Sequence, residues 1–316
     1  MAVTKTRRFL AEAALLYAAA IWGSTFFVVK DALDFVDPVV LVGIRFTIAG
    51  ILLGAWLCWR RVNMLAQLRH GLVLGVILWV LYITQTVGLG ITTASNSGFI
   101  TGLFIVFVPL VNWLWLHKVP KVRHIVAVLL ALGGLWLLTG GIEGINAGDI
   151  MTLAAAVTYA LHVAYAGRCM EEAVDPWVLN FQQILLIGLL SLATAAVQGG
   201  LKAGPAGIPI GESLAAQFAV TSSSAWWVLV FLAVFPTITA YVAQLYGQQV
   251  VDATRAALIF TMEPVFAAAF AWTLGGELFK AENAFGGGLM VVAMVVSGID
   301  WRRLKASLGL VPVNPP

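Results

Sequence analysis

Apolar stretches of about 20 residues, separated by short polar segments, follow one another along almost the whole chain. Each is long enough to cross a bilayer, and a backbone in lipid must pair its own polar groups, so we expect helices. The pattern predicts an all-α integral membrane protein with ten transmembrane helices. Their expected ranges are 9–29, 38–58, 71–90, 95–116, 122–140, 149–168, 176–198, 226–248, 255–274 and 282–300.

Local sequence marks some of the expected boundaries. Asp37-Pro38 and Asp175-Pro176 are typical of helix starts and open the second and seventh spans. The segment Gly199–Ser224 contains Gly, Pro and Ser, so we expect it to be the one long loop.

Composition agrees with a lipid environment and excludes several partners. The chain is 61% hydrophobic and 10% charged, with a mean hydropathy of +0.95, whereas soluble domains carry about 25% charged residues. A net charge of +3, without a stripe of Lys and Arg, argues against nucleic acid. Cys58 and Cys169 lack metal-ligand spacing, so we expect no metal, and we expect no cofactor. Both fall near helix ends that we place toward the cytosol, so we expect free thiols.

The distribution of basic residues predicts the orientation in a cell (inner) membrane. Segments on the N-terminal side of the membrane hold fourteen Lys and Arg, and the opposite loops hold only three, which are Lys30, Lys202 and Lys280. Since cytoplasmic loops are enriched in Lys and Arg, both termini should be cytoplasmic. The fourteen are Lys5, Arg7, Arg8, Arg60, Arg61, Arg69, Lys118, Lys121, Arg123, Arg168, Arg255, Arg302, Arg303 and Lys305.

A polar pattern occurs twice. The sequence Tyr-x-x-Gln-x-x-Gly begins at Tyr82 and again at Tyr241, 159 positions later, so Gln85 corresponds to Gln244. The third and fourth spans align with the eighth and ninth at this offset. The first two align with the sixth and seventh at about 138, and one longer loop explains the difference.

The alignment predicts a duplicated chain. Residues 1–140 and 149–300 form two five-helix repeats, followed by a cytosolic tail at 301–316. Because five is odd, the second repeat must be inverted relative to the first, an arrangement in which two halves can rock around a central site.

Five stretches of the sequence match a known family in their order and spacing. They are Ile44-Arg45-Phe46, Thr92-Thr93-Ala94-Ser95-Asn96-Ser97-Gly98-Phe99-Ile100-Thr101-Gly102-Leu103, Val106-Phe107-Val108-Pro109, Met262-Glu263-Pro264-Val265-Phe266-Ala267 and Gly276-Glu277. With these stretches the chain resembles the drug/metabolite transporter superfamily, and within it the EamA-type exporters. The resemblance covers essentially all ten spans and implies two inverted repeats around a central cavity, lined by spans one, three, four, six, eight and nine. It also implies export of small metabolites, often amino acids.

One position departs from the family pattern. The first repeat has His117-Lys118 where family repeats usually place Gly-Glu, as the second does at Gly276-Glu277. Any role of this acidic position therefore rests on Glu277 alone.

Two charged residues lie deep inside expected spans rather than near their ends. A carboxylate at membrane depth costs about 2–3 kcal/mol, so Glu263, directly before Pro264, should face the bundle interior. It is a candidate for contact with a substrate amine or for proton coupling, and equally for a structural role at the proline. Arg45 keeps its charge and needs a partner. We expect a structural role for Arg45, with a substrate carboxylate as the alternative, because span two is peripheral in the family.

Aromatic and amide side chains form the rest of the candidate cavity wall. Tyr82 and Gln85 share a helix face, as do Tyr241 and Gln244, and an aromatic face with an amide suits a zwitterion that carries an apolar side chain. Hydrogen bonding between helices is the alternative. Further candidates at mid-depth are Trp22, Trp79, Tyr159 and His162. His162 also qualifies as a proton carrier, or as a hydrogen-bonded structural residue.

The pattern favours a secondary transporter that exports small amphipathic metabolites, foremost amino acids and among them aromatic or hydrophobic ones. The sequence Gly-x-x-x-x-Gly-Lys-Ser/Thr is absent, which argues against ATP as the direct energy source. A drug, cation or nucleotide-linked sugar transporter of the same fold is the alternative. A membrane-embedded lipid-modifying enzyme is a more distant alternative, because it needs a clustered set of catalytic groups, which the sequence does not indicate. The expected partners are a small-molecule substrate and the lipid bilayer, with the protein a monomer or a homodimer.

Overall fold

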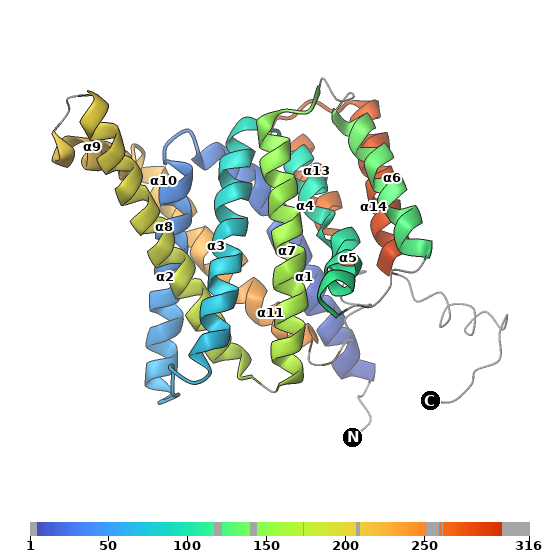
Figure 1. The fold of residues 1–316 in the computed structure, drawn as a ribbon, viewed down its shortest axis with the longest axis horizontal. Coiled ribbons are helices and arrows are strands. Elements are labelled where there is room, and N and C mark those ends of the chain that lie inside the picture. The colour runs from blue at the N-terminus through green and yellow to red at the C-terminus, as the bar shows by residue number, and fades with distance from the viewer. Residues whose placement is uncertain are drawn as a thin grey trace.

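The computed structural model describes residues 5–116, 122–139, 144–172, 174–206, 209–248, 250, 259–260 and 262–298. The described chain is helical throughout (Figure 1). Its elements are α1 (Lys5–Ala32), α2 (Pro38–Trp59), α3 (Leu68–Ile91), α4 (Ala94–Gly102), α5 (Phe104–Leu116), α6 (Val122–Thr139), α7 (Ala147–Glu171), α8 (Pro176–Ala206), α9 (Ile210–Gln217), α10 (Ser223–Leu232), the π-helix η2 (Ala233–Thr239), α11 (Ala240–Gln248), α13 (Met262–Thr273) and α14 (Ala281–Gly298). His117, Lys118, Arg255 and the predicted tail 301–316 lie outside the described residues.

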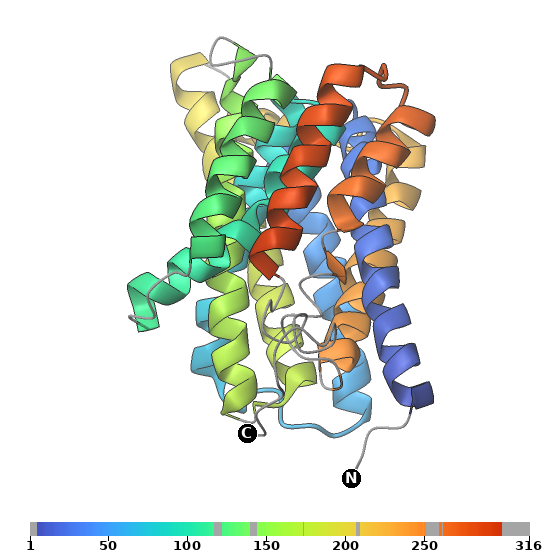
Figure 2. The ribbon, with the colours of Figure 1, turned by 90° about the vertical axis from the view of Figure 1, so that its right-hand side faces the viewer.

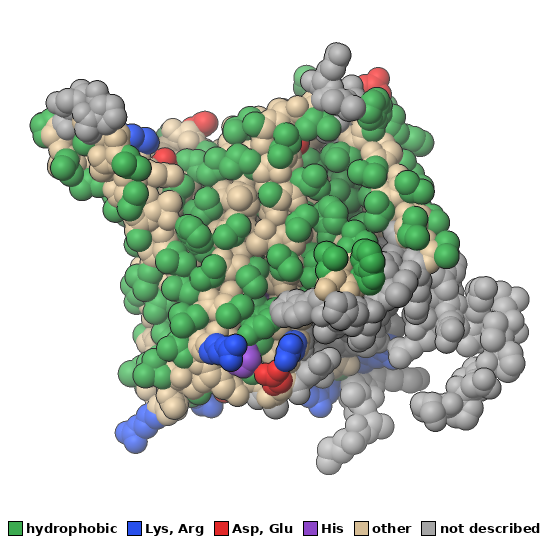
Figure 3. Space-filling model, viewed as in Figure 1, with side chains coloured by type: hydrophobic (Ala, Val, Ile, Leu, Met, Phe, Trp, Pro, Cys, Tyr) green, Lys and Arg blue, Asp and Glu red, His purple; other side chains and the backbone are tan. Residues whose placement is uncertain are grey.

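Within the described ranges, six helical segments are long and apolar enough to cross a membrane. They are Thr6–Ala32, Pro38–Trp59, Leu68–Ile91, Ala147–Ala166, Pro176–Ala203 and Ser223–Gln244. Shorter apolar helices occupy Ala94–Val108, Ile125–Leu137 and Ala281–Val296. Hydrophobic side chains cover the flank of the bundle in a broad band, and Lys, Arg and His side chains gather along its lower edge (Figure 3).

The two Asp-Pro pairs start helices as the sequence predicts. Asp37 precedes α2, and its carboxylate accepts hydrogen bonds from the amides of Val39 and Val40 at 2.9 and 3.3 Å. Asp175 caps α8 in the same way, with Trp177 N at 2.8 Å. In each case the cap satisfies helix-terminal amides that have no partner within the helix.

The prediction of one long loop over Gly199–Ser224 is wrong. Helix α8 continues to Ala206, and α9 packs back against it to form a hairpin (Figure 1). The Ser213 hydroxyl donates to the Gly199 carbonyl at 2.7 Å, and Lys202 Nζ donates to Gln217 Oε1 at 2.6 Å. These tertiary hydrogen bonds stabilise helical structure over residues whose composition is typical of a loop.

Two predicted spans are interrupted. The fourth divides at Leu103, where Leu103 N bonds to Ile100 O and Val106 N bonds to Leu103 O, three residues apart, which tightens the backbone between α4 and α5. The eighth contains η2, with Pro236 inside it. Proline removes a backbone donor, and π-helical turns often occur at functional sites.

Helices from the first half of the chain pack on helices from the second half. Helix α1 lies against α13, α2 against α8, α3 against α7, and α6 against α14. Helices α6 and α14 run side by side at one edge of the bundle (Figures 1 and 2). The backbones of α3 and α7 are in close contact at Gly88. A Cβ atom added to Gly88 would lie only 2.8 Å from the carbonyl oxygen of Gly148. Glycine at this contact therefore permits the close approach.

Candidate functional site

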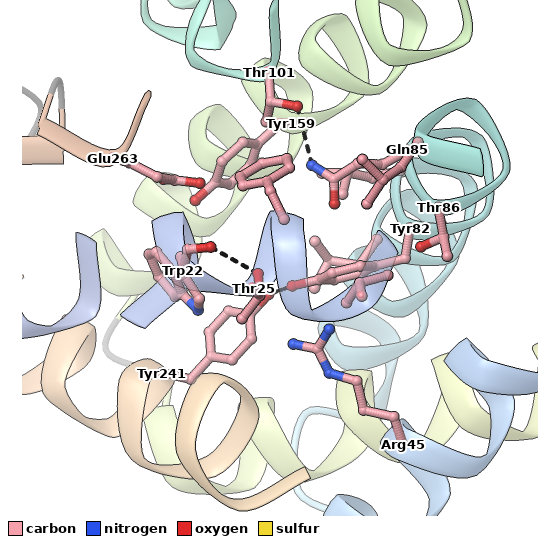
Figure 4. Close-up of a pocket in the computed structure, with 15 residues that line it drawn as sticks. Trp22, Thr25, Arg45, Tyr82, Gln85, Thr86, Thr101, Tyr159, Tyr241 and Glu263 are labelled. Atoms are coloured by element: carbon pink, nitrogen blue, oxygen red, sulfur yellow. Dashed lines mark hydrogen bonds between the residues drawn. The ribbon is translucent and has the colours of Figure 1, made fainter. Parts of the chain in front are cut away.

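A pocket of about 40 Å³ lies in the interior of the bundle, between α1, α2, α3, α4, α7, α11 and α13 (Figure 4). Aromatic and polar side chains dominate one part of its wall, and aliphatic side chains the rest. Its lining consists of Trp22, Thr25, Phe26, Val29, Arg45, Leu78, Leu81, Tyr82, Gln85, Thr86, Leu89, Thr101, Tyr159, Tyr241 and Glu263.

Two tyrosines from the repeated pattern meet at this pocket. The hydroxyls of Tyr82 and Tyr241 are 3.0 Å apart and share a hydrogen bond. The Trp22 ring meets that of Tyr241 edge-on, with centroids 5.4 Å apart, and Tyr159 lines the pocket from α7. The wall thus offers both π-faces and hydroxyl groups.

Arg45 reaches the pocket from α2, although we expected its helix to be peripheral. Its side chain is 4% exposed, and its guanidinium lies 5.5 Å from the centroid of the Tyr82 ring. Nε donates to Thr237 Oγ1 at 2.9 Å. One hydrogen bond fixes the guanidinium edge at Nε, and a guanidinium carries five N–H donors in all.

The π-helix provides the partners that hold two of these side chains. Thr237 Oγ1 donates to Leu232 O at 2.8 Å while it accepts from Arg45. The Trp22 indole N–H donates to Pro236 O at 2.8 Å. The irregular backbone of η2 therefore orients side chains from α1 and α2 toward the pocket.

Glu263 lies in the first turn of α13 and is 6% exposed. Among the described residues, its Oε2 atom has no hydrogen-bond partner. In Figure 4 the carboxyl group points toward the hydroxyl end of Tyr159. A buried carboxyl oxygen without a partner is costly unless another group, such as a ligand, supplies a donor.

Three threonines line the pocket that the sequence analysis did not single out, namely Thr25, Thr86 and Thr101. Thr101 Oγ1 accepts from Gln85 Nε2 at 3.1 Å, which places the predicted Gln85 amide in the wall. Thr101 lies within the stretch that resembles the EamA family, and Thr25 lies one turn after Trp22. The family stretch and the spacing from Trp22 were the signals in the sequence that could have identified Thr101 and Thr25 as lining residues.

Three predicted residues are absent from the lining, although the structure describes each of them. His162 is buried, and its Nε2 pairs with Gln183 Oε1 of α8 at 3.0 Å. Gln183 in turn donates to Asn180 Oδ1. Trp79 is half-buried and Gln244 is buried, and neither lines the pocket.

Cys58 and Cys169 are free thiols, as the sequence predicts. In the described part of the chain, no three His, Cys, Asp or Glu side chains gather in a way that suits a metal ion.

Comparison with known proteins identifies the family. The model of the EamA-like transporter family matches residues 9–140 and, a second time, residues 146–299. The chain belongs to the EamA-like transporter family. Two matched regions of similar length suggest that the transporter arose by duplication.

Individual relatives that align with nearly the whole chain support the same family. A transporter of Archaeoglobus fulgidus is 31% identical over 294 residues, which cover 92% of this chain and 86% of the relative. The inner membrane transporter YedA of Escherichia coli K12 is 27% identical over 313 residues, 95% of this chain and 94% of the relative. The S-adenosylmethionine/S-adenosylhomocysteine transporter of Chlamydia muridarum is 23% identical and covers 87% of both.

A solved structure shares the fold, with a TM-score of 0.65 and 19% identity, over 93% of this chain and 98% of the other. The EamA-like protein is therefore a multi-pass membrane transporter rather than an enzyme, and the substrate of such a transporter is a small molecule.

Proposed function

We propose that the chain is a secondary transporter that exports amino acids with apolar or aromatic side chains by alternating access. The observation that carries this proposal is the arrangement of charge in the pocket. Arg45 and Glu263 lie on opposite sides of it, with Tyr82, Tyr241 and Trp22 between them (Figure 4).

This arrangement is complementary to an amphipathic zwitterion. The guanidinium of Arg45 binds the substrate carboxylate, and the unpartnered oxygen of Glu263 accepts from the substrate ammonium group. The aromatic faces contact the apolar side chain and also attract the ammonium group. Both buried charges thus gain a partner in the complex.

The size of the pocket supports a change of conformation during transport. A volume of about 40 Å³ corresponds to only a few water molecules, at about 10–15 Å³ for each. An amino acid is larger than this, so the helices around the pocket must separate before it enters.

We further propose that residues 1–140 and 149–300 are two inverted five-helix repeats, which together make ten spans. The packing pattern supports this. If α1 is exchanged with α7, and α3 with α11, the observed contact of α3 with α7 becomes the observed contact of α11 with α1. The contacts of α2 with α8 and of α6 with α14 map onto themselves. Such symmetry is typical of transporters whose halves rock around a central site.

For orientation, we propose that both termini and the tail 301–316 are cytoplasmic. Arg8 lies in the first helical turns of α1, Arg60 directly after α2, and Arg168 in the last turn of α7. Basic residues at these helix ends favour the cytoplasmic side.

The test is efflux from proteoliposomes loaded with a mixture of amino acids, with and without a proton gradient. Selective loss of apolar and aromatic amino acids supports the proposal, and the gradient separates facilitated movement from proton coupling. Retention of every amino acid under both conditions contradicts it. A protein with Arg45 and Glu263 both replaced (R45M/E263Q) is the matched control.

A second candidate is the transport of an amino acid that carries an adenosyl group. The Chlamydia muridarum relative is named for S-adenosylmethionine and S-adenosylhomocysteine, which combine a zwitterion with an aromatic base. The same charged pair and aromatic wall would bind both ends of such a molecule. Competition by S-adenosylmethionine against efflux of labelled phenylalanine distinguishes the two candidates.

Drug-like cations and nucleotide-linked sugars receive less support. Arg45 is the only Lys or Arg among the described residues that line the pocket, and a nucleotide-linked sugar brings one or two phosphates, most often two. A cation without a carboxylate would leave this guanidinium unpaired in the complex.

A further inference from the structure

Side chains from three other parts of the fold bind the turn between α3 and α4. Lys30 at the end of α1 donates through Nζ to the carbonyls of Leu89 and Thr92, at 2.9 and 2.6 Å. Asp149 at the start of α7 accepts from Thr92 Oγ1 at 2.5 Å. Glu277, in the segment after α13, accepts from the turn as well. We call Lys30, Asp149 and Glu277 the turn clamp.

Glu277 caps the first turn of α4 from a distance of more than 180 positions along the chain. One carboxyl oxygen accepts from the Ala94 amide. The other accepts from the amide and the hydroxyl of Ser95, at 3.3 and 2.6 Å. These amides begin a helix and lack partners within it, so a carboxylate there is bound tightly.

The charges of the clamp match the backbone around the turn. Lys30 binds the carbonyl of Leu89 in the last turn of α3, at the negative end of the helix dipole, and the carbonyl of Thr92 directly after it. Glu277 binds the positive end of the next helix, α4. Asp149 is itself held in place, because Asn146 N donates to Asp149 Oδ2 at 3.1 Å and Asp149 N donates to Asn146 Oδ1 at 3.0 Å. The turn is therefore bound by groups that are themselves oriented.

The clamp adjoins the pocket. Val29 and Leu89 line the pocket, Lys30 follows Val29 directly, and the carbonyl of Leu89 is one of its acceptors. Directly beside the turn, a Cβ on Gly148 would lie 2.8 Å from Thr92 N, so α7 already touches the backbone there. Separation of the helices at this end would therefore break hydrogen bonds of the clamp.

We propose that the turn clamp is the gate that closes the pocket at this end of the bundle, and that its release exposes the pocket to this side of the membrane. The proposal rests on the alternating access proposed above, and not on the identity of the substrate. In the orientation proposed above, this is the outer side. Glu277 and Asp149 then determine the balance between the two access states without contact with the substrate.

The experiment measures access to the pocket directly. Thr25 lines the pocket and is replaced by cysteine (T25C) in a chain without its own thiols (C58S/C169A). A membrane-impermeant, charged methanethiosulfonate reagent is added to intact cells, and separately to inside-out vesicles. The rate of modification is compared among Glu277→Gln, Asp149→Asn, the milder Ser95→Ala and the control Glu282→Gln, an exposed acid at the start of α14.

Loss of one charged hydrogen bond changes an equilibrium constant by about tenfold or more. We therefore expect Glu277→Gln and Asp149→Asn to raise the rate of modification at the outer face, in intact cells, by about tenfold. The same variants should lower the rate at the inner face, in inside-out vesicles. Ser95→Ala should give a smaller change in the same direction, and Glu282→Gln none. Should a charge variant fail to fold, Ser95→Ala alone still carries the test.

Rates equal to those of Glu282→Gln in all variants, whether fast, slow or zero, overturn the proposal. So does an equal rise from both faces, which indicates general loosening. A one-sided rise in inside-out vesicles supports the clamp but reverses the orientation. Because no substrate is added, a chain that moves no amino acid still reports on the clamp. Conversely, amino acid transport with unchanged labelling leaves the proposed function intact and removes only the gate.

Discussion

The hydroxyl oxygens of Tyr82 and Tyr241 lie 3.0 Å apart in the wall of the pocket, and 159 positions separate the two residues along the chain. Each begins one copy of the Tyr-x-x-Gln-x-x-Gly pattern. Both side chains line the pocket in the interior of the bundle, and each hydroxyl has the other as its hydrogen-bond partner. Movement of either helix away from the pocket breaks it.

Replacement of either tyrosine by phenylalanine should weaken substrate binding. Either substitution removes the hydrogen bond that holds the two rings in the pocket wall, where the substrate binds. Such a neutral bond contributes about 0.5–1.5 kcal/mol, so Tyr82→Phe and Tyr241→Phe should each raise the half-saturating amino acid concentration about 2- to 10-fold. The double variant should lose little more than one single variant, because the two share one bond. Tyr246→Phe, whose side chain is 39% exposed, is the control. Unchanged affinity in both single variants would argue against a role of this pair in the pocket.

Glu263→Gln should impair substrates that carry an ammonium group. The variant keeps the shape of the side chain and removes its charge, which weakens a charged hydrogen bond of about 1.5–3 kcal/mol. Amino acid affinity should fall about 10- to 100-fold, and the affinity for the corresponding acid without an amine should change much less. Competition against a labelled amino acid measures both, with Glu282→Gln as the exposed control. An equal loss for both ligands would point to a structural role.

The same variant tests proton coupling at this position. If Glu263 carries the coupled proton, efflux by Glu263→Gln loses its response to an imposed proton gradient. Transport that persists with an unchanged response excludes an obligatory role of Glu263 in coupling.

Arg45→Lys should not preserve the function of the guanidinium. Lysine carries the charge but is a compact point donor, so it cannot both donate from the position of Nε to Thr237 and present a planar edge to a carboxylate. We expect about a tenfold or larger loss of amino acid affinity, and no matching loss for an amine that lacks the carboxylate. Arg60→Lys, at an exposed position after α2, is the control. Full activity of Arg45→Lys would leave only the charge as relevant.

Gly148→Ala should destabilise the protein. A Cβ at this position would lie 2.4 Å from the carbonyl oxygen of Gly88, so α3 and α7 must separate, which typically costs about 1–3 kcal/mol. Gly200→Ala is the matched control, because nothing lies within 4 Å of its Cβ position and alanine favours a helix by up to about 1 kcal/mol. Thermal unfolding in detergent should rank Gly148→Ala below the parent and Gly200→Ala at or above it. The reverse order would contradict the close contact.

Features that depend on neighbouring residues were predicted correctly. Asp37 and Asp175 each bond to amides two and three positions further on, so a cap can be recognised from a few residues. The all-α membrane class was predicted from the length and composition of the apolar stretches, and the family match confirms it. The error at Gly199–Ser224 arose because contacts between α8 and α9, rather than local composition, stabilise helix there.

The candidate site was predicted only in part. Six of the predicted cavity residues line the pocket, while Trp79, His162 and Gln244 lie elsewhere on helices that also contribute to it or contact it. Each of the three is three positions from a residue that lines the pocket, namely Tyr82, Tyr159 or Tyr241, so it shares that residue's helix face and lies about one turn along the helix. The difference is therefore one of depth along the helix rather than of face. The spacing of polar residues indicates which face turns inward, but the depth at which the helices enclose a pocket depends on how they pack.

The sequence by itself determined that the chain is a helical membrane protein, where several helices begin, and that a polar pattern is duplicated, because these properties depend on helix length, local capping and direct comparison of residues. Only the tertiary structure decided that Arg45 binds Thr237 from 192 positions away, that η2 orients Trp22, and that Glu277 caps α4. Each of these contacts joins a side chain to a side chain or backbone group of a distant part of the chain. Their geometry depends on the relative rotation and displacement of the helices, which packing of the whole bundle sets.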